Sequence, residues 1–275
     1  MSEKSISKIA VLPGELFQNR KLIWKLAKND FKKRFAGSYM GMLWAMAQPV
    51  VTVVMYWLVF DKIFGNKSEM MAGNLEVPYV LYLTAGLVPW FFFSEAVNHG
   101  MMALLEYNYL VKKVVFKISI LPIVKVMGAG FIHVFFMGVL LLLCIAYGHY
   151  PTIYTVQLLY YSFCTFAFVL ALSYSTCAIV VFFRDLQQII SIVLQVGMWA
   201  TPIMWNIDRA GEYQKLFQLN PMTYIVNGYR SAIFEKTWFF EQTFSTIYFW
   251  GITIVLFIIG ATLFKRLKVH FADVL

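Results

Sequence analysis

Two ionisable side chains stand one helical turn apart inside an otherwise apolar stretch. Glu95 precedes His99 by four residues, which places both side chains on one face of a helix. Ionisable groups inside a membrane segment are rare and are functional candidates by default, and a proton-coupled carrier would use them. The alternative is a locally satisfied pair with a structural role. A carrier of that kind usually has more than one such group, whereas Glu95 is the one acid placed well inside an apolar run.

The remaining reactive side chains form no catalytic or metal-binding motif. The three cysteines lie inside apolar runs and the four histidines are dispersed, so the sequence has no CxxC or HExxH motif. It also has no GxxxxGK[ST] loop to cradle ATP phosphates. The scattered acids that form no recognisable acid–base pair are Asp61, Glu69, Glu76 and Asp185. We expect a chain that is not an enzyme, holds no metal or cofactor, and takes energy from another protein.

Three consecutive basic residues could bind phosphate at the membrane surface. They are Lys32, Lys33 and Arg34. Lysine acts on phosphate as a point charge, and arginine acts as a two-pronged donor. These residues would meet a diphosphate headgroup arriving on the inner side, although ordinary anionic lipids explain them equally well.

The composition of the chain is that of a membrane protein. Hydrophobic residues make up 60% of the 275 residues and charged residues 13%, and the mean hydropathy is +0.68. A soluble domain averages about 45–50% apolar and about 25% charged residues. The formal charge of +9 lies largely beside apolar runs, where it sets topology and meets anionic headgroups, which argues against a nucleic-acid surface.

The apolar runs predict an all-α fold with six transmembrane helices, since about 20 helical residues cross a bilayer core. The predicted spans are residues 41–60, 77–105, 118–147, 154–183, 186–205 and 244–264. Pro49, Pro89 and Pro202 lie in the first, second and fifth spans, where neighbouring helices or water can satisfy the freed carbonyls. We divide the chain into a cytoplasmic N-terminal segment, residues 1–36, and a transmembrane domain, residues 37–275.

A ridge of small side chains marks the fourth predicted span. It consists of Ala167, Ala171 and Ser175, spaced four residues apart. Small residues at this spacing let another helix approach closely. We expect a structural role for this ridge.

The distribution of basic residues orients the chain in the plasma membrane. With the N-terminus inside, seventeen Lys and Arg residues lie on the cytoplasmic side and six lie outside. This asymmetry predicts that both termini are cytoplasmic and that the number of spans is even. The first 35 residues are polar and basic and lack the apolar region of a signal peptide.

Residues 15–35 predict an amphipathic helix that lies in the inner membrane surface. Its apolar stripe consists of Leu16, Ile23, Leu26, Ala27, Phe31 and Phe35. The lysines on a different face are Lys21, Lys25, Lys28 and Lys32. An apolar stripe with lysines opposite is typical of an interfacial helix. The alternative is a solvated helix that packs on a partner.

Two loops differ from simple connections between spans. The cytoplasmic loop at residues 106–117 is short, mixed in polarity and compatible with a helix, so it could dock into a groove on a soluble protein. The residues expected to make this contact are Glu106, Tyr107, Asn108, Tyr109, Leu110, Lys112 and Lys113. The outer loop at residues 206–242 becomes apolar after Asn220 and Pro221, which can cap and begin a helix. We expect this helix to lie in or dip into the outer leaflet, with Tyr224, Tyr229 and Arg230 on it.

Aromatic residues make up 18% of the chain and could line a path for sugars and lipid tails. The candidates are Trp44, Tyr56, Trp57, Trp90, Phe91, Phe92, Phe93 and Trp199. The alternative for many of them is contact with lipid or a place in the interfacial belts.

Three stretches together resemble the ABC-2 type permeases that export cell-surface polysaccharides. The first is residues 34–44, a basic segment followed by glycine and tryptophan, with Gln48 and Pro49 shortly after. The second is the loop at 106–117, and the third is residues 219–230. With the six-span plan, the resemblance covers nearly the whole chain and depends on the combination and order of the stretches. Within that family the chain most resembles the wall teichoic acid translocation permeases.

The resemblance implies a mechanism for the chain. Two copies of the permease would pair with two copies of a separate ATP-binding subunit, which binds ATP and Mg. Residues 106–117 would be the coupling segment in that subunit, and residues 220–234 would form re-entrant outer helices. The cargo would be wall teichoic acid on an isoprenoid diphosphate lipid, moved from the inner to the outer leaflet. O-antigen or capsular polysaccharide is the alternative cargo.

Other functions remain open on the sequence alone. A secondary carrier or channel would depend on Glu95, so Glu95→Gln would abolish its transport. A membrane-embedded transferase would need positioned acids or histidines at a membrane face. A drug or small-lipid exporter of the same family would change drug sensitivity without accumulating polymer intermediates.

Overall fold

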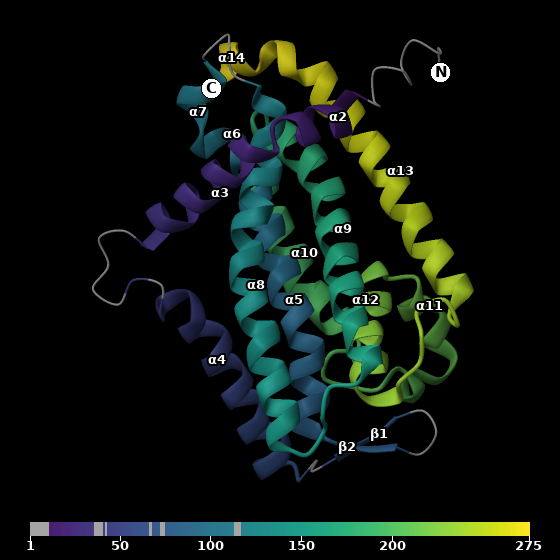
Figure 1. Ribbon diagram of the computed structural model, residues 1–275. Coiled ribbons are helices and arrows are strands. Elements are labelled where there is room, and N and C mark those ends of the chain that lie inside the picture. The colour runs from purple at the N-terminus through teal and green to yellow at the C-terminus, as the bar shows by residue number, and fades with distance from the viewer. Residues whose placement is uncertain (1–10, 36–40, 42, 66–67, 72–74, 113–116) are drawn as a thin grey trace.

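Apolar helices account for most of the computed structural model, which describes residues 11–35, 41, 43–65, 68–71, 75–112 and 117–275 (Figure 1). Five helical segments of this described chain are long and apolar enough to cross a membrane. They are α4 (Leu43–Trp57) with its π-helical continuation η1 (Leu58–Ile63), α5 (Tyr79–Met101), α8 (Leu121–Ala146), α9 (Gln157–Val180) and α13 (Thr243–Leu267). They correspond to five of the six predicted spans.

The predicted fifth span forms a shorter helix, α10 (Leu186–Ala200). Its 15 residues are fewer than the about 20 that cross a bilayer core. The helix stops there because Thr201 precedes Pro202 and takes an extended conformation, with φ −99° and ψ 134°. Pro49 and Pro89, by contrast, lie within α4 and α5.

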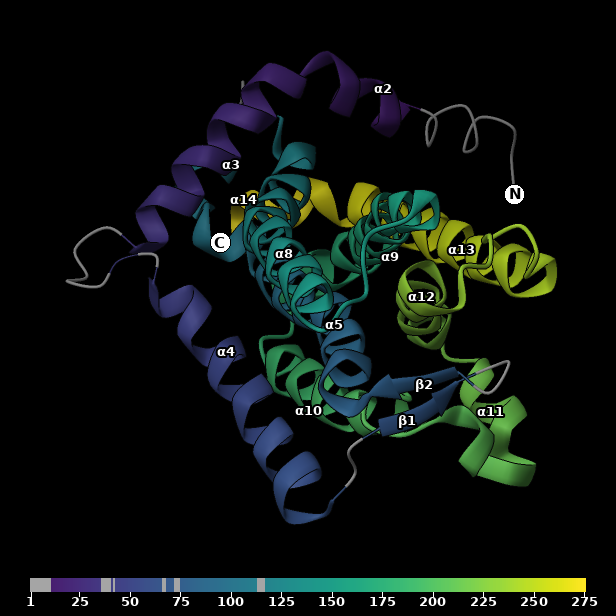
Figure 2. The ribbon, with the colours of Figure 1, turned by 60° about the horizontal axis from the view of Figure 1, so that its bottom comes forward.

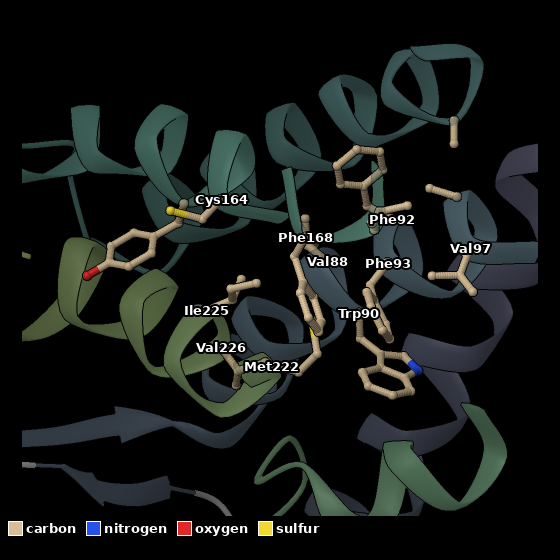
Figure 3. Close-up of a cluster of buried hydrophobic side chains, with 14 of the residues drawn as sticks. Val88, Trp90, Phe92, Phe93, Val97, Cys164, Phe168, Met222, Ile225 and Val226 are labelled. Carbon is tan, nitrogen blue, oxygen red and sulfur yellow. The ribbon is translucent and has the colours of Figure 1, made fainter. Parts of the chain in front are cut away.

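Helix α5 forms the centre of the bundle. It packs against α8, α9 and α12 (Pro221–Arg230), and most of its side chains are buried. Figure 3 shows Phe93 beside Phe168 of α9, with Met222 and Ile225 of α12 nearby. The Phe93 and Phe168 rings are stacked with their centroids 5.6 Å apart. Apolar side chains from helices far apart in sequence therefore share one core.

The small-residue ridge of α9 contacts α13, as the sequence predicts. A Cβ atom on Gly260 of α13 would lie 2.8 Å from the Ala171 carbonyl oxygen and 3.0 Å from the Ser175 nitrogen. Only glycine lets the two backbones come this close.

The predicted amphipathic segment forms two helices, α2 (Val11–Gln18) and α3 (Arg20–Phe35), rather than one. Helix α3 packs on α8 and on the turn before it through Ile23 and Ala27, which meet Val124 of α8 and Ile120. The four predicted lysines are exposed. The described residues of the predicted apolar stripe therefore pack on protein, and the side chain of Phe35 lies outside the described part of the chain.

Several short helices lie at the same end of the molecule as α3 (Figure 1). They are α6 (Ala103–Glu106), α7 (Asn108–Val111), η3 (Ile118–Ile120), η7 (Lys268–His270) and α14 (Phe271–Val274). The N-terminal helix, the 106–112 segment and the C-terminal helix thus share one end of the molecule.

A β-hairpin departs from the predicted all-α fold. Strands β1 (Ser68–Met71) and β2 (Leu75–Pro78) pair antiparallel, with Glu69 opposite Val77. Residue 77 was predicted to begin the second span. The helix begins at Tyr79 instead, because Pro78 holds the preceding backbone extended and proline favours the start of a helix over its interior.

The outer loop is helical, as predicted. It contains η5 (Ile207–Tyr213), α11 (Gln214–Gln218), α12 and the π-helical η6 (Ser231–Glu235), while η4 (Ile153–Val156) precedes α9. The Asn220 side chain accepts a hydrogen bond from the Met222 backbone N–H at 3.0 Å, and Pro221 occupies the first turn. This cap and proline confirm the predicted helix start.

Candidate coupling and transport site

A cluster of charged side chains joins four elements at the α3 end of the molecule. Arg34 of α3 donates through Nη1 to Glu95 Oε1 of α5 at 3.1 Å, and its Nε lies 3.3 Å from Asp30 Oδ2. Lys125 of α8 lies 2.5 Å from both Asp30 Oδ1 and Glu106 Oε2. We call these five residues the inner charge cluster. It connects α3 to α5, to α8 and, through Glu106, to the 106–112 segment.

Asp30 is the centre of the inner charge cluster. Its side chain is buried, and it also accepts a hydrogen bond from the Tyr107 hydroxyl at 2.7 Å. Burial raises the pKa of this carboxyl, but hydrogen bonds from Lys125 and Tyr107 and the charges of Lys125 and Arg34 outweigh it. The pKa of Asp30 therefore lies below its ordinary value. Burial and the hydrogen bond to Asp30 raise the pKa of Tyr107, so both groups keep their present charge at neutral pH.

The 106–112 segment presents most of its predicted contact residues outward. Glu106, Asn108, Tyr109 and Lys112 are exposed, and Leu110 is half-buried. Tyr107 points inward instead, because it is 8% exposed and bonds to Asp30. Lys113 lies outside the described residues. The exposed side chains form a surface on this segment. The segment is attached to the inner charge cluster by the Tyr107–Asp30 hydrogen bond and the Glu106–Lys125 salt bridge.

Glu95 has a nearer partner than His99. The Glu95 carboxylate lies 3.9 Å from His99 Nε2 but 3.1 Å from Arg34 Nη1. A satisfied acid is what the structural alternative predicts, although the main partner comes from α3 rather than from the same helix. An ion pair of this kind leaves Glu95 less available for ion coupling.

The three basic residues of the 32–34 run have different surroundings. Lys32 and Lys33 are exposed, whereas the Arg34 side chain is 14% exposed and turned toward Asp30 and Glu95. The Arg34 Nη2 atom is buried and has no hydrogen-bond partner in the described part of the chain. Lys32 and Lys33 are therefore accessible at the surface, whereas Arg34 links α3 to α5.

The predicted path aromatics fall into three groups. Trp90, Phe92 and Phe93 are buried in the core of the bundle (Figure 3). The half-buried group consists of Tyr56, Trp57 and Phe91. Trp44 on α4 is 59% exposed and Trp199 on α10 is 61% exposed. Trp44 and Trp199 thus have the most surface available for contact with a cargo or a second copy, and the half-buried aromatics have less.

At the opposite end, Arg230 fastens α12 to the rest of the bundle. Its guanidinium is buried and donates to the carbonyls of Tyr82, Pro202 and Ile203 at 3.3, 2.6 and 2.7 Å. It also stacks 3.5 Å over the Tyr82 ring. A Cβ on Gly86 would lie 2.9 Å from Nη2, so this position admits the guanidinium only because it is glycine. The Pro202 and Ile203 carbonyls lie just after the end of α10, so these hydrogen bonds connect Arg230 of α12 to the C-terminal end of α10.

The other predicted outer residues also lie in contacts between helices. The Tyr229 hydroxyl is buried 3.0 Å from His133 Nε2 of α8 and 2.7 Å from Ser162 Oγ of α9. The Tyr224 hydroxyl lies 2.9 Å from Thr246 Oγ1 of α13. Helix α12 is thus tied to α8, α9 and α13 by hydroxyl contacts.

Comparison with known protein families decides which family this arrangement belongs to. The ABC-2 type transporter family matches residues 21–234, which is most of the chain. The chain belongs to the ABC-2 type transporter family. The matched range of this ABC-2 permease runs from α3 to η6 and includes both the inner charge cluster and α12.

Three relatives of this ABC-2 permease are named as O-antigen export permeases. The O-antigen export system permease protein RfbA of Myxococcus xanthus is 32% identical over 228 residues, covering 82% of this chain and 84% of the relative. Two proteins of the same name from Klebsiella pneumoniae are each 26% identical over 267 residues, covering 95% of this chain and 96% of the relative. The similarity therefore extends over almost the full length.

Two residues of the ABC-2 permease site were not identified from the sequence. Asp30 continues the buried stripe of α3, following Ile23 and Ala27 at spacings of four and three. An acid at such a position requires a partner, so this signal was present in the sequence. Lys125 gave a weaker signal, because a lysine near the cytoplasmic end of a span is ordinary.

Proposed function

We propose that this chain is the permease subunit of an ATP-driven exporter that moves a lipid-linked polysaccharide from the inner to the outer leaflet of the plasma membrane. The observation that carries the proposal is the similarity to O-antigen export permeases over 95% of the chain. The proposed topology has six spans, both termini in the cytoplasm, and α10 as the fifth span. At 15 residues, α10 is about 22 Å long. The chain would thus turn back within the outer leaflet, with α11 and α12 as the re-entrant region.

The proposed complex contains two copies of the permease and two copies of an ATP-binding subunit that holds ATP and Mg. Residues 106–117 are the proposed contact with that subunit. Exposure of Tyr109 and Asn108 supports this role, as does the salt bridge from Glu106 to Lys125. Movement of the segment would be passed through Asp30 to α3 and through Arg34 to α5.

The proposed cargo is an O-antigen-type polysaccharide on an isoprenoid diphosphate lipid. The relatives support this alternative better than wall teichoic acid, which the sequence placed first. Lys32 and Lys33 are the proposed contacts for the diphosphate and for anionic lipids. Trp44 and Trp199 remain the proposed path aromatics.

The family assignment also bears on the rival mechanisms. An ABC-2 permease takes its energy from an ATP-binding partner, so a carrier driven by Glu95 is no longer needed to explain transport. The pairing of Glu95 with Arg34 supports the same conclusion. Export of a drug or small lipid remains the competing function within the family. Loss of surface polysaccharide on depletion of the chain would distinguish polymer export from that function.

Affinity purification tests the proposal. The tagged chain is extracted in mild detergent, its partners are identified by mass spectrometry, and ATPase activity and surface polysaccharide are measured in parallel. We expect a near-stoichiometric partner with a GxxxxGK[ST] loop, and loss of surface polysaccharide when the chain is depleted. Recovery of the chain without an ATP-hydrolysing partner, or unchanged surface polysaccharide after depletion, would refute the proposal.

A contact variant tests the coupling role separately. Tyr109→Ala removes an exposed aromatic anchor, and Tyr213→Ala removes a similarly exposed tyrosine from the outer loop as a control. We expect the first variant to lose partner binding and export while it remains folded, and the second to keep both.

A further inference from the structure

A cavity lined by both polar and apolar side chains opens at the outer end of the molecule and is not used by the proposed mechanism. Its volume is about 930 Å³. It is bounded by α12 and η6, by η5 and α11, and by the residues that lead into α13. In Figure 2, α11, α12 and the start of α13 gather on one side of this end, away from α4 and α10. We call it the outer pocket.

The base of the outer pocket is built from buried, already satisfied groups. Arg230 contributes to the lining, but its guanidinium is bonded to three backbone carbonyls. The Tyr224 hydroxyl is held by Thr246 and by the Tyr160 hydroxyl at 3.2 Å. The charge of Arg230 is therefore committed to the protein and is poorly placed to capture an anion.

The sides of the pocket supply hydrogen-bonding groups that remain available. The side-chain amides of Asn227 and Gln218 line the cavity and make no hydrogen bond to the described residues. Glu235 is half-buried and accepts from Ser231 Oγ at 2.7 Å through one oxygen only. Asp208 and Glu241 are likewise each held through a single oxygen, by Gln214 and by the Trp238 N–H. Each carboxylate keeps its second oxygen as an acceptor.

We propose that the outer pocket binds uncharged sugar residues of the exported polymer as they reach the outer side. This inference rests on the proposed export function and specifies the chemistry of its cargo. Sugar hydroxyls both donate and accept, so they match a wall of amides and carboxylates. Tyr248, which bonds to the Leu219 carbonyl, and Phe244, which is 84% exposed, add aromatic surface at the mouth for the C–H faces of sugar rings.

The charge of the pocket argues against a polyol-phosphate polymer or a phospholipid headgroup. Three carboxylates line the cavity, from Asp208, Glu235 and Glu241. The basic residues in the lining are Lys215 and Arg230, and the guanidinium of Arg230 is already bonded to backbone carbonyls. No salt bridge joins these carboxylates to a cation in the described part of the chain. Phosphate groups would meet net repulsion here, whereas hydroxyl groups would gain charge-assisted hydrogen bonds.

Cysteine protection in living cells tests this inference. Gln218→Cys places a thiol in the pocket, and Glu212→Cys places one on the neighbouring exposed segment outside it. The native cysteines Cys144, Cys164 and Cys177 are buried, so they contribute little labelling. Cells expressing each variant are treated with a membrane-impermeant maleimide, with polymer synthesis active or blocked at its first glycosyl transfer. Surface polysaccharide is measured in the same cells.

Polymer synthesis should slow labelling of Gln218→Cys by about fourfold. This is the protection expected when the local concentration of sugar segments is about three times their dissociation constant for the pocket. Labelling of Glu212→Cys should not change. Adding Asn227→Leu should reduce the protection below about twofold, because one lost hydrogen bond weakens binding by about fivefold. Glu235→Gln should also weaken protection. Stronger protection in Glu235→Gln would instead indicate a phosphate-bearing ligand and would overturn the inference.

Two further outcomes separate this inference from the export function. If export depends on the chain but Gln218→Cys is never protected, or is protected no more than Glu212→Cys, the pocket does not bind the polymer and the export function stands. If the surface polysaccharide does not depend on the chain, the proposed export function is wrong whatever the labelling shows.

Discussion

Arg34 and Glu95 show how single side chains connect the surface of this permease to its interior. Arg34 was predicted to meet a headgroup, and Glu95 was predicted either to couple ions or to pair with His99. The two side chains instead bind each other at 3.1 Å across 61 residues of sequence. A long-range pair gives no periodic signal, so local spacing could not reveal it. What the sequence did supply was the rarity of an acid inside an apolar run, which marked Glu95 as a functional candidate.

The first prediction uses two replacements of Glu95. Glu95→Gln keeps an acceptor for the Arg34 guanidinium, so we expect export within about twofold of wild type. Glu95→Leu leaves that guanidinium without an acceptor, and we expect a loss of about 2 kcal/mol in stability. Surface polysaccharide and thermal unfolding in detergent measure the two effects. A folded Glu95→Gln protein without export would instead support ion coupling through Glu95.

The second prediction concerns pH and Asp30. Its folded-state pKa lies below the unfolded value of about 3.9. The ionised carboxylate therefore stabilises the fold fully above that value, and this contribution is lost as the pH falls through the folded pKa. Removing one partner of a buried pair costs about 3–5 kcal/mol. We expect Asp30→Asn to lower the free energy of unfolding by about 2 kcal/mol at pH 7, below that range, because Lys125 keeps Glu106 as a salt-bridge partner.

Thermal unfolding of both proteins from pH 7 to pH 3 measures this effect. The difference between wild type and Asp30→Asn should stay constant down to about pH 5 and shrink below about pH 4. A difference that grows on acidification would contradict the assigned direction of the pKa shift.

At the scale of elements, the helices were largely predictable and their contacts were not. Asn220 and Pro221 located the start of α12, and the apolar runs located α4, α5, α8, α9, α10 and α13. The β-hairpin was missed because each strand has four residues, and Glu69 and Glu76 disfavour strands. Composition likewise could not distinguish buried from outward aromatics, so Trp90 and Trp199 received the same prediction.

The third prediction tests the predicted ridge where α9 meets α13. Gly260→Ala adds a Cβ 2.8 Å from a backbone carbonyl, which cannot move as a side chain does. We expect a cost of about 1–3 kcal/mol, the range for overpacking. Gly251→Ala on the same helix adds a Cβ with nothing within 4 Å and serves as the control. Thermal unfolding in detergent should separate the two, and equal midpoints would show that the helices do not pack this closely.

At the scale of the whole molecule, two helices lie at the margin of the bundle. In Figure 2, α4 stands outside α5 and α8, and α10 lies on the same side of the molecule. Neither α4 nor α10 buries a described residue within this copy. Half-buried Leu194 and Met198 attach α10 to the core, while Val193 and Val196 are 57% and 61% exposed. Composition predicts that such a face avoids water, but it does not distinguish lipid from a second copy.

The fourth prediction is that α10 lies at the axis of a two-fold dimer. In such a dimer, a residue near the axis faces its own counterpart, so Val193→Cys should cross-link to itself under mild oxidation in membranes. Ile254→Cys on α13 has similar exposure, 55%, but lies on the far side of the bundle and should stay monomeric. The measurement is the fraction of chain at twice the monomer mass on a non-reducing gel.

Comparing the two cysteines decides which face joins the copies. Random collision in the bilayer would cross-link both variants equally, because both side chains reach the lipid to a similar extent. Cross-linking of Ile254→Cys alone would place the axis at α13, beside the outer pocket, and would leave α4 and α10 facing lipid. Cross-linking of Val193→Cys alone would place the dimer interface on the exposed surface of α10, which also carries Trp199. A cargo path between the copies would then run along α10, and the outer pocket would lie to one side of its exit.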